Sequence, residues 1–185
     1  MARVGYLVHT LPDEYYTQIG AILAKWASLE YQMMYIIWRA MGLENEEGRV
    51  LTVGMGTQVL CGILRNLPRK WITQPDVQTA VADLVKFVSE HADSRNYLAH
   101  GMWTKFPDDP APYLNFMKTG EHRILPAAQA VTPEQLRGFS AALDAMNHLA
   151  SQIISVVGGN AAPPLPDKSE EQNPAGLPTQ TQTGK

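Results

Sequence analysis

The residues whose types and spacing indicate chemistry lie in one stretch, RNYLAHG, from Arg95 to Gly101. Asn96 follows the arginine directly, and His100 comes after three more residues. An unperturbed histidine titrates near pH ~6.5, so His100 can take or give a proton at neutral pH. Arginine stays charged, and its planar guanidinium suits the oxygens of a phosphate undergoing substitution. The stretch therefore combines a group that can transfer a proton with a fixed positive charge, and Asn96 could orient the imidazole or hold a substrate.

A long amphipathic helix is expected to position this stretch. It begins at Thr73-Gln-Pro-Asp76, which offers a hydroxyl cap and an early proline, and it ends at His100 before the glycine. Counted forward by whole turns, its apolar stripe reaches Arg95 and places the arginine on the core-facing line. That stripe comprises Val77, Val81, Leu84, Val88 and Ala92.

The same helical spacing separates the neighbours of Arg95. Asn96 and His100 are four residues apart, so they share one flank of the helix. Tyr97 is expected to point away from the core stripe. The arginine is therefore predicted on the core side, with the amide and the imidazole together beside it.

Three further amphipathic helices complete a predicted bundle. The first spans about residues 13 to 41, and the second ends before Pro68 after a polar connection over residues 44 to 49. The fourth opens with a capping box at Thr132-Pro-Glu-Gln135 and ends at residues 158–159. We therefore expect an all-α fold, an antiparallel four-helix bundle.

The periodicity changes between the third and fourth helices. The runs at residues 102 to 106, at residues 112 to 117 and near Ile124 are bounded by prolines and Gly120, which predicts a short β-hairpin-like excursion. The apolar run from Val4 to Val8 is expected to be a lead-in that packs on the bundle.

Length and composition limit the number of domains. With 185 residues, 45% of them hydrophobic, the chain can bury one core, so we expect one helical domain over residues 1–159. Residues 160–185 are rich in Pro, Gln, Thr and Gly and are expected to be disordered. Within them, the PPLP run at residues 163–166 could adopt a polyproline II helix and bind a partner protein.

Charge and cysteine content exclude several functional classes. A net charge of −3 argues against a protein that coats nucleic acid without specificity, so any RNA contact must be local. Cys61 is the single cysteine, which excludes an intramolecular disulfide and fits a reducing compartment. No signal-like segment and no apolar run of about 20 residues is present. We therefore expect a cytoplasmic protein that does not cross a membrane.

The pattern R-N-x-x-x-H resembles the signature of HEPN domains, small helical bundles of which many are metal-independent ribonucleases. In catalytic members the arginine and histidine act on RNA, which is cut by attack of a ribose 2′-hydroxyl on the adjacent phosphate. The resemblance implies that Arg95, Asn96 and His100 are catalytic, that RNA is the substrate and that no cofactor is needed. It covers the third helix directly, and the rest of the chain agrees in helix number and order.

The resemblance also implies a biological setting and partners. Family members often face their two motifs across a dimer interface, so we expect a homodimer. A toxin or phage-defence role follows, with an antitoxin or a protein that binds the tail as a candidate partner. Some antitoxin-paired members carry a tyrosine two residues after the histidine, where this chain has Met102. The alternative function is a noncatalytic dimeric binding module of the same fold.

A purely structural interpretation of these residues remains open. Glu30 lies in the middle of the apolar stripe of the first helix, where a carboxylate needs a partner. It could form a buried ion pair with Arg95, with Asn147 completing the network, while His100 caps the helix C-terminus. In the functional interpretation the Glu30 carboxylate would hold the Arg95 guanidinium in position to bind phosphate.

A basic cluster closes the second helix. Arg65, Arg69 and Lys70 are followed by Trp71. Such a cluster is typical of a solvated helix end whose cations favour the helix dipole, and it could also guide an RNA backbone.

No metal site is expected. A zinc or iron site needs ligands brought together by spacing, and the chain has no CxxC pair. The histidines outside the motif also lack a spacing that would place two of them on one turn. These are His9, His91, His122 and His148.

Overall fold

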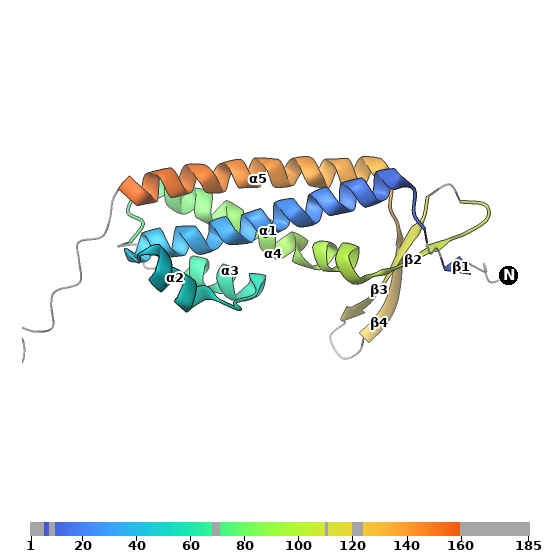
Figure 1. Ribbon diagram of the computed structural model, residues 1–185, viewed down its shortest axis with the longest axis horizontal. Helices are drawn as coiled ribbons and strands as arrows, with labels where there is room; N and C mark the ends of the chain where they lie inside the picture. Colours follow the sequence, from blue (N-terminus) through green and yellow to red (C-terminus); the bar gives the residue numbers. More distant parts are fainter. Residues whose placement is uncertain (1–5, 8–9, 68–70, 110, 120–123, 160–185) are drawn as a thin grey trace, which may run out of the picture.

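The computed structural model describes residues 6–7, 10–67, 71–109, 111–119 and 124–159 of the chain. In these residues five helices form an elongated bundle, and a four-stranded antiparallel sheet lies at one end of it (Figure 1). The helical bundle expected from the sequence is therefore present, with a different number of helices. The expectations for the tail at residues 160–185 fall outside the described residues.

The first helix, α1, spans Asp13–Met41, as predicted. It ends at Gly42, whose φ of 70° and ψ of 27° lie in the left-handed region, where a glycine pays no steric penalty. Arg39 in the last turn favours the helix dipole. One long face of α1 is buried and supplies much of the core, including Trp26, Leu29, Met33 and Ile36.

The predicted second helix corresponds to α3 (Thr57–Asn66), and a further helix that was not expected, α2 (Asn45–Thr52), precedes it. The segment expected to be a polar connection begins α2, because the backbone N–H of Glu44 donates to the side chain of Glu47 across 3.1 Å and closes the first turn. Gly54, with a φ of 77°, lies between the two helices. The apolar spacing alone did not reveal α2.

The helices α4 (Pro75–His100) and α5 (Pro133–Gly159) confirm the remaining helix predictions. The capping box that opens α5 is formed, since Gln135 N–H donates to Thr132 Oγ1 across 3.3 Å and Thr132 N–H to Gln135 Oε1 across 2.8 Å. The expected hydroxyl cap of α4 is not formed. Its N-cap residue is Gln74, and the described residues provide no side-chain cap hydrogen bond.

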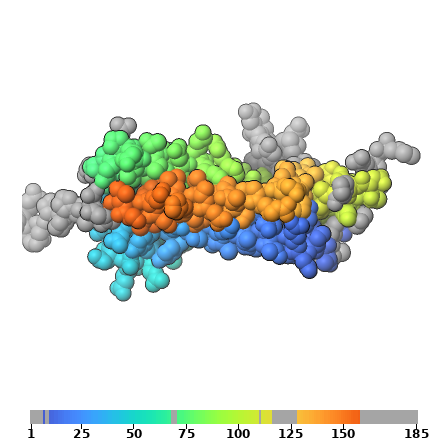
Figure 2. Space-filling model, turned by 90° about the horizontal axis from the view of Figure 1, so that it is seen from above, coloured from blue at the N-terminus to red at the C-terminus, as the bar shows by residue number. Residues whose placement is uncertain are grey.

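The helix directions differ from those of a simple antiparallel bundle. Lys25 of α1 pairs with Asp144 of α5, with 2.6 Å between Nζ and Oδ2. Later in both helices, Gln32 of α1 donates a hydrogen bond to Asn147 of α5 across 2.7 Å. The contacts advance in the same direction, so α1 and α5 are parallel neighbours. The α4 helix runs the opposite way, and α5 lies lengthwise between α1 and α4 (Figures 1 and 2).

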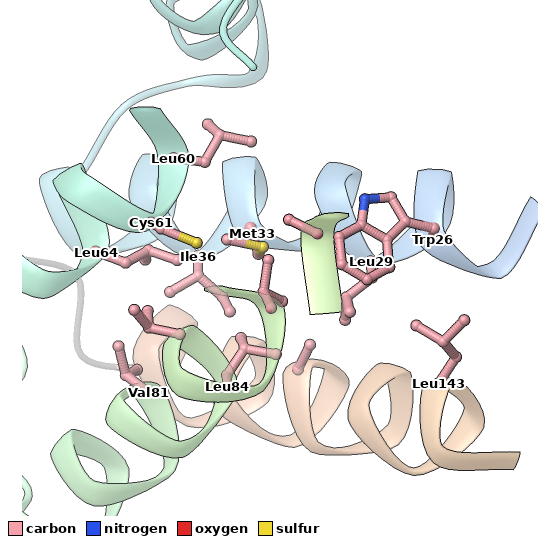
Figure 3. Close-up of a cluster of buried hydrophobic side chains, with 14 of the residues drawn as sticks. Trp26, Leu29, Met33, Ile36, Leu60, Cys61, Leu64, Val81, Leu84 and Leu143 are labelled. Carbon is pink, nitrogen blue, oxygen red and sulfur yellow. The ribbon is translucent and has the colours of Figure 1, made fainter. Parts of the chain in front are cut away.

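The core of the bundle lies where α1, α3, α4 and α5 meet (Figure 3). Leu60, Cys61 and Leu64 of α3 pack there against the buried face of α1, and Leu143 enters from α5. The predicted stripe of α4 is confirmed, because each of its members is buried: Val77, Val81, Leu84, Val88 and Ala92.

The expected hairpin-like excursion is a larger sheet than predicted. Strands β2 (Met102–Lys105), β3 (Tyr113–Thr119) and β4 (Ile124–Ala130) are joined by β1 (Tyr6–Leu7) in the order β1-β2-β3-β4. Residues 6 and 7 of the N-terminal run thus pair with β2, with Tyr6 opposite Lys105. These two residues are therefore part of the sheet, whereas the sequence predicted only a segment that packs on the bundle.

Candidate functional site

The last turns of α4 carry the three predicted catalytic residues. The buried stripe of α4 leads onto Arg95, whose side chain is half-buried. Its Nη1 donates a hydrogen bond to Oδ1 of Asn96 across 2.9 Å. Its Nε is buried and has no acceptor among the described residues. Because burying a charged donor without an acceptor is costly, a further acceptor at this Nε–H would be stabilising.

His100 is the last residue of α4 and is exposed. Asn96 is exposed as well and lies on the same flank, one turn earlier. Within the described residues, the structure joins Arg95 to Asn96 and shows no hydrogen bond from His100 to either of them. The side chains that sequence reasoning placed on one flank are therefore close and accessible, with the imidazole open to solvent.

Gly101 fixes the place where α4 ends. Its φ of −74° and ψ of 155° are accessible to any residue, so the glycine is not needed for a left-handed turn. It is needed for close packing, because an added Cβ would lie 2.5 Å from Leu114 Cδ1 and 2.6 Å from the carbonyl oxygen of Tyr97. The backbone at the end of α4 therefore lies close against strand β3 at Gly101.

The predicted ion pair between Glu30 and Arg95 is absent, although the structure describes both residues. Glu30 instead accepts a hydrogen bond from the Thr57 hydroxyl, at the first residue of α3. A carboxylate at a helix N-terminus also favours the helix dipole. The prediction failed because sequence reasoning could not place the start of α3 beside α1.

Asn147 does not complete a network around Glu30 either. Its Nδ2 donates to the carbonyl oxygens of Lys25, across 3.1 Å, and Leu143, across 2.9 Å, while its Oδ1 accepts from Gln32. The residue is polar on an otherwise apolar stripe because it ties α5 to α1. Its role is to fix the register of these two parallel helices.

The basic cluster is only partly described. Arg65 is exposed and donates from Nη2 to Ser89 Oγ across 3.2 Å, at the rim of a cavity of about 580 Å³ between α3 and α4. Ser89 precedes Asn96 by seven residues and therefore lies on the same flank of α4, about 10 Å away along the axis. Arg69 and Lys70 lie outside the described residues.

Sequence reasoning missed a second cavity on the other flank of α4. It has a volume of about 360 Å³ and lies between α4, α5 and strands β3 and β4. Tyr97, expected to point away from the core, is half-buried and lines it together with His91 and Phe139. His91, Ser94 and Tyr97 are three residues apart along α4, and this spacing could have indicated that they share one face of the helix.

The two side chains whose pKa is shifted, Cys61 and Tyr15, are not part of the Arg95–His100 motif. Burial raises the pKa of the Cys61 thiol, so this cysteine is a poor nucleophile in the folded chain. Burial, with the nearby Glu14 and Glu134 carboxylates, raises the pKa of Tyr15. No group of three or more His, Cys, Asp or Glu side chains is arranged to hold a metal ion in the described ranges.

Among the helices that the structure describes, none is both long and apolar enough to cross a membrane.

Comparison with known proteins adds no relative. No family model matches the chain, and neither the curated proteins nor the solved structures contain a match. The resemblance to HEPN domains therefore rests on Arg95, Asn96 and His100 and on the helix that carries them.

Proposed function

We propose that this protein is a metal-independent endoribonuclease of the HEPN type, with Arg95, Asn96 and His100 at its active site. The observation that carries the proposal is the state of Arg95. The guanidinium is half-buried at the end of an apolar stripe, yet no carboxylate among the described residues pairs with it and its Nε–H has no acceptor there. The buried ion pair required by the structural interpretation is missing. A phosphate oxygen is the acceptor that the proposal supplies.

The chemistry assigns one role to each side chain. His100 takes the proton of the ribose 2′-hydroxyl, whose oxygen attacks the adjacent phosphorus. The bond from phosphorus to the 5′-oxygen breaks, and the products are a 2′,3′-cyclic phosphate and a 5′-hydroxyl. Arg95 stabilises the charge that develops on the phosphate oxygens, and Asn96 holds the guanidinium through its 2.9 Å hydrogen bond.

The departing 5′-oxygen needs a proton, and this requirement supports a homodimer. His100 is the one histidine of the motif, and its exposed position at the end of α4 leaves it accessible to a second copy. In the proposed dimer, His100 of one copy acts as the base and His100 of the other as the acid. Breaking the dimer should then abolish cleavage without unfolding the chain.

The decisive experiment incubates the full chain with structured RNA in a chelator. We expect cleavage that leaves a 2′,3′-cyclic phosphate, and no cleavage of DNA, which lacks the 2′-hydroxyl. His100→Ala should cut at least ~100-fold more slowly, since proton transfer commonly contributes that much. His148→Ala is the matched control, because His148 is also exposed but lies on α5. Equal cleavage by wild type and His100→Ala would contradict the proposal.

A noncatalytic binding module is the second candidate. The observation that favours it is the absence, among the described residues, of a hydrogen bond between His100 and either Arg95 or Asn96. For this module, His100→Ala would weaken association between chains or with RNA, and no RNA would be cut at any concentration of enzyme.

A further inference from the structure

The cavity on the far flank of α4 is built from two helices and the sheet. It is lined on α4 by His91, Ser94 and Tyr97, on α5 by Gly138 and Phe139, and on β4 by Gln129. No Lys, Arg, Asp or Glu side chain lines it. Its volume of about 360 Å³ is at the lower end of the range for small-molecule sites. The occupant that fits is therefore small and uncharged where it is enclosed.

Aromatic rings form one wall of this cavity. The His91 ring stacks on Phe87 with 4.3 Å between centroids and 19° between planes, and on Phe139 with 5.5 Å and 28°. Phe87 itself does not line the cavity, and Tyr97, about one and two-thirds turns after His91 on α4, is the third lining ring. Because His91 is already stacked on two rings, the surfaces left for another planar ring are those of Phe139 and Tyr97 and the edge of His91.

Hydrogen-bonding groups stand among these rings. His91 Nδ1 lies 2.9 Å from the carbonyl oxygen of Phe87, so Nδ1 carries the proton and donates, and in the neutral ring Nε2 is left as an acceptor. The Ser94 hydroxyl and the Gln129 carboxamide can each donate and accept. The walls thus combine flat apolar faces with a mixed set of donors and acceptors.

We propose that this cavity binds a single purine or pyrimidine base. A base is a planar ring of suitable size, uncharged at neutral pH, with donors and acceptors along its edge, and proteins recognise unpaired bases by stacking and edge hydrogen bonds. A phosphate or carboxylate group does not fit, because no cationic side chain lines the walls. The proposal rests on the ribonuclease function in one respect only, that the base belongs to the RNA that is cut.

The position of the cavity relative to His100 supports that link. Tyr97 precedes His100 by three residues, so on α4 the two side chains lie about 60° apart around the axis and about 4.5 Å apart along it. A nucleotide whose base enters beside Tyr97 therefore directs its sugar and phosphate toward the end of α4. The cavity would select the base next to the cleaved phosphate.

Gly138 provides a direct test, because it lines the cavity and an added Cβ there meets no atom within 4 Å. Gly138→Leu should fill the cavity without straining α5. Gly20→Leu is the matched control, since Gly20 also lies in a long helix with no atom within 4 Å of an added Cβ, and it does not line the cavity. Ser94→Phe obstructs the same space from α4, independently of α5.

Binding is measured by NMR titration of the full chain with adenosine, uridine, ribose 5-phosphate and a 2′-O-methyl RNA oligonucleotide, which cannot be cut. We expect adenosine or uridine to shift the signals of Tyr97 and Phe139 saturably, and ribose 5-phosphate to leave them unchanged. Gly138→Leu and Ser94→Phe should raise the Kd at least tenfold, and Gly20→Leu should not. If the oligonucleotide also binds, and the same two variants weaken its binding, the base belongs to RNA. If nucleosides bind and the oligonucleotide does not, the ligand is a free nucleotide.

The outcomes separate this proposal from the ribonuclease. Base binding that survives in His100→Ala and is lost in Gly138→Leu supports the cavity even if no RNA is cleaved. Unchanged nucleoside affinity in Gly138→Leu, the absence of any nucleoside binding, or equally tight binding of indole would overturn the base site. If Gly138→Leu cleaves RNA with an unaltered KM, the ribonuclease function is supported, but the cavity does not bind a base of the RNA that is cut.

Discussion

Arg95 donates a hydrogen bond from Nη1 to Oδ1 of its neighbour Asn96 across 2.9 Å, in place of the expected pairing with Glu30. Because Asn96 is exposed, its amide can hold the guanidinium without contributing much to stability. The bond leaves the positive charge of Arg95 unneutralised. That is the state in which an arginine is best able to bind phosphate.

The first prediction concerns this bond. Asn96→Asp places a carboxylate against the Arg95 guanidinium, where it should compete with phosphate and raise the KM for RNA by up to about fivefold, because an exposed ion pair is worth about 0.2–1 kcal/mol. Asn96→Ala should lower kcat more than it raises KM, because the guanidinium loses its orientation. Both melting temperatures should stay near that of wild type. A steady-state comparison with Asp93→Asn, an exposed control on α4, tests this, and equal kinetics in all variants would refute it.

A second prediction separates the two candidate partners of Glu30. Glu30→Ala should lower the free energy of unfolding by about 1.5–3 kcal/mol, the range for a hydrogen bond to a charged group, because the carboxylate accepts from Thr57. In double-mutant cycles, Glu30→Ala should couple with Thr57→Ala by on the order of 1 kcal/mol. With Arg95→Ala the effects should add within about 0.5 kcal/mol. If Glu30→Ala instead couples with Arg95→Ala and not with Thr57→Ala, the hypothesis of a buried ion pair between Glu30 and Arg95 would be correct.

What the sequence predicted correctly was local. The buried stripe of α4 from Val77 to Ala92 and the capping box at Thr132 follow from helical spacing and from hydrogen bonds within a few residues. These features do not depend on where the rest of the chain goes. The same local reasoning placed Arg95, Asn96 and His100 on their helix and on their faces of it.

What it missed depended on long-range packing. The partner of Glu30 is set by the start of α3, which is fixed by the reversal near Gly54. Tyr97 was assigned by its angle from one apolar stripe, but α4 is covered on two sides, by α1 and α3 and also by α5 with the sheet. The pairing of Tyr6 with Lys105 joins residues about a hundred positions apart, which no local pattern reveals.

A third prediction tests the close packing of α2 on α1. Gly48 is buried, and an added Cβ would overlap the indole ring of Trp38. Trp38 cannot easily move, because it is buried and its Nε1 donates to Thr52 Oγ1 across 3.1 Å. Gly48→Ala should therefore destabilise by at least about 1–3 kcal/mol, the usual cost of overpacking. Gly20→Ala, in open space on α1, should instead stabilise by roughly 0.5–1 kcal/mol in the same chemical denaturation.

A fourth prediction concerns alkaline pH. The buried Tyr15 hydroxyl donates to the Val131 carbonyl across 2.9 Å, and burial raises the pKa of Tyr15. Since the folded pKa exceeds the unfolded value, this contribution is fully present below about pH 10 and is lost as the pH rises through the folded pKa. Tyr15→Phe should cost about 1 kcal/mol at neutral pH and should lessen the alkaline loss. Tyr31→Phe, an exposed control, should follow wild type in urea denaturation at each pH.

The last prediction links the sheet to the candidate active site through Gly101. Gly101→Ala forces a Cβ toward Leu114 of β3 and toward the Tyr97 carbonyl oxygen, at 2.5 and 2.6 Å. Neither β3 nor the last turn of α4 can yield freely, because Gly101 N–H also donates to that carbonyl across 2.7 Å. We therefore expect a loss of about 1–3 kcal/mol and a displaced His100.

Small displacements of a catalytic group are expensive, so at a temperature where the variant stays folded, kcat should fall on the order of ~100-fold. Gly62→Ala is the control, because an added Cβ there meets no atom within 4 Å. The NMR titration of the His100 imidazole in each variant gives an independent readout of its surroundings. If Gly101→Ala is destabilised yet cleaves RNA at the wild-type rate, contact with β3 stabilises the fold without positioning His100.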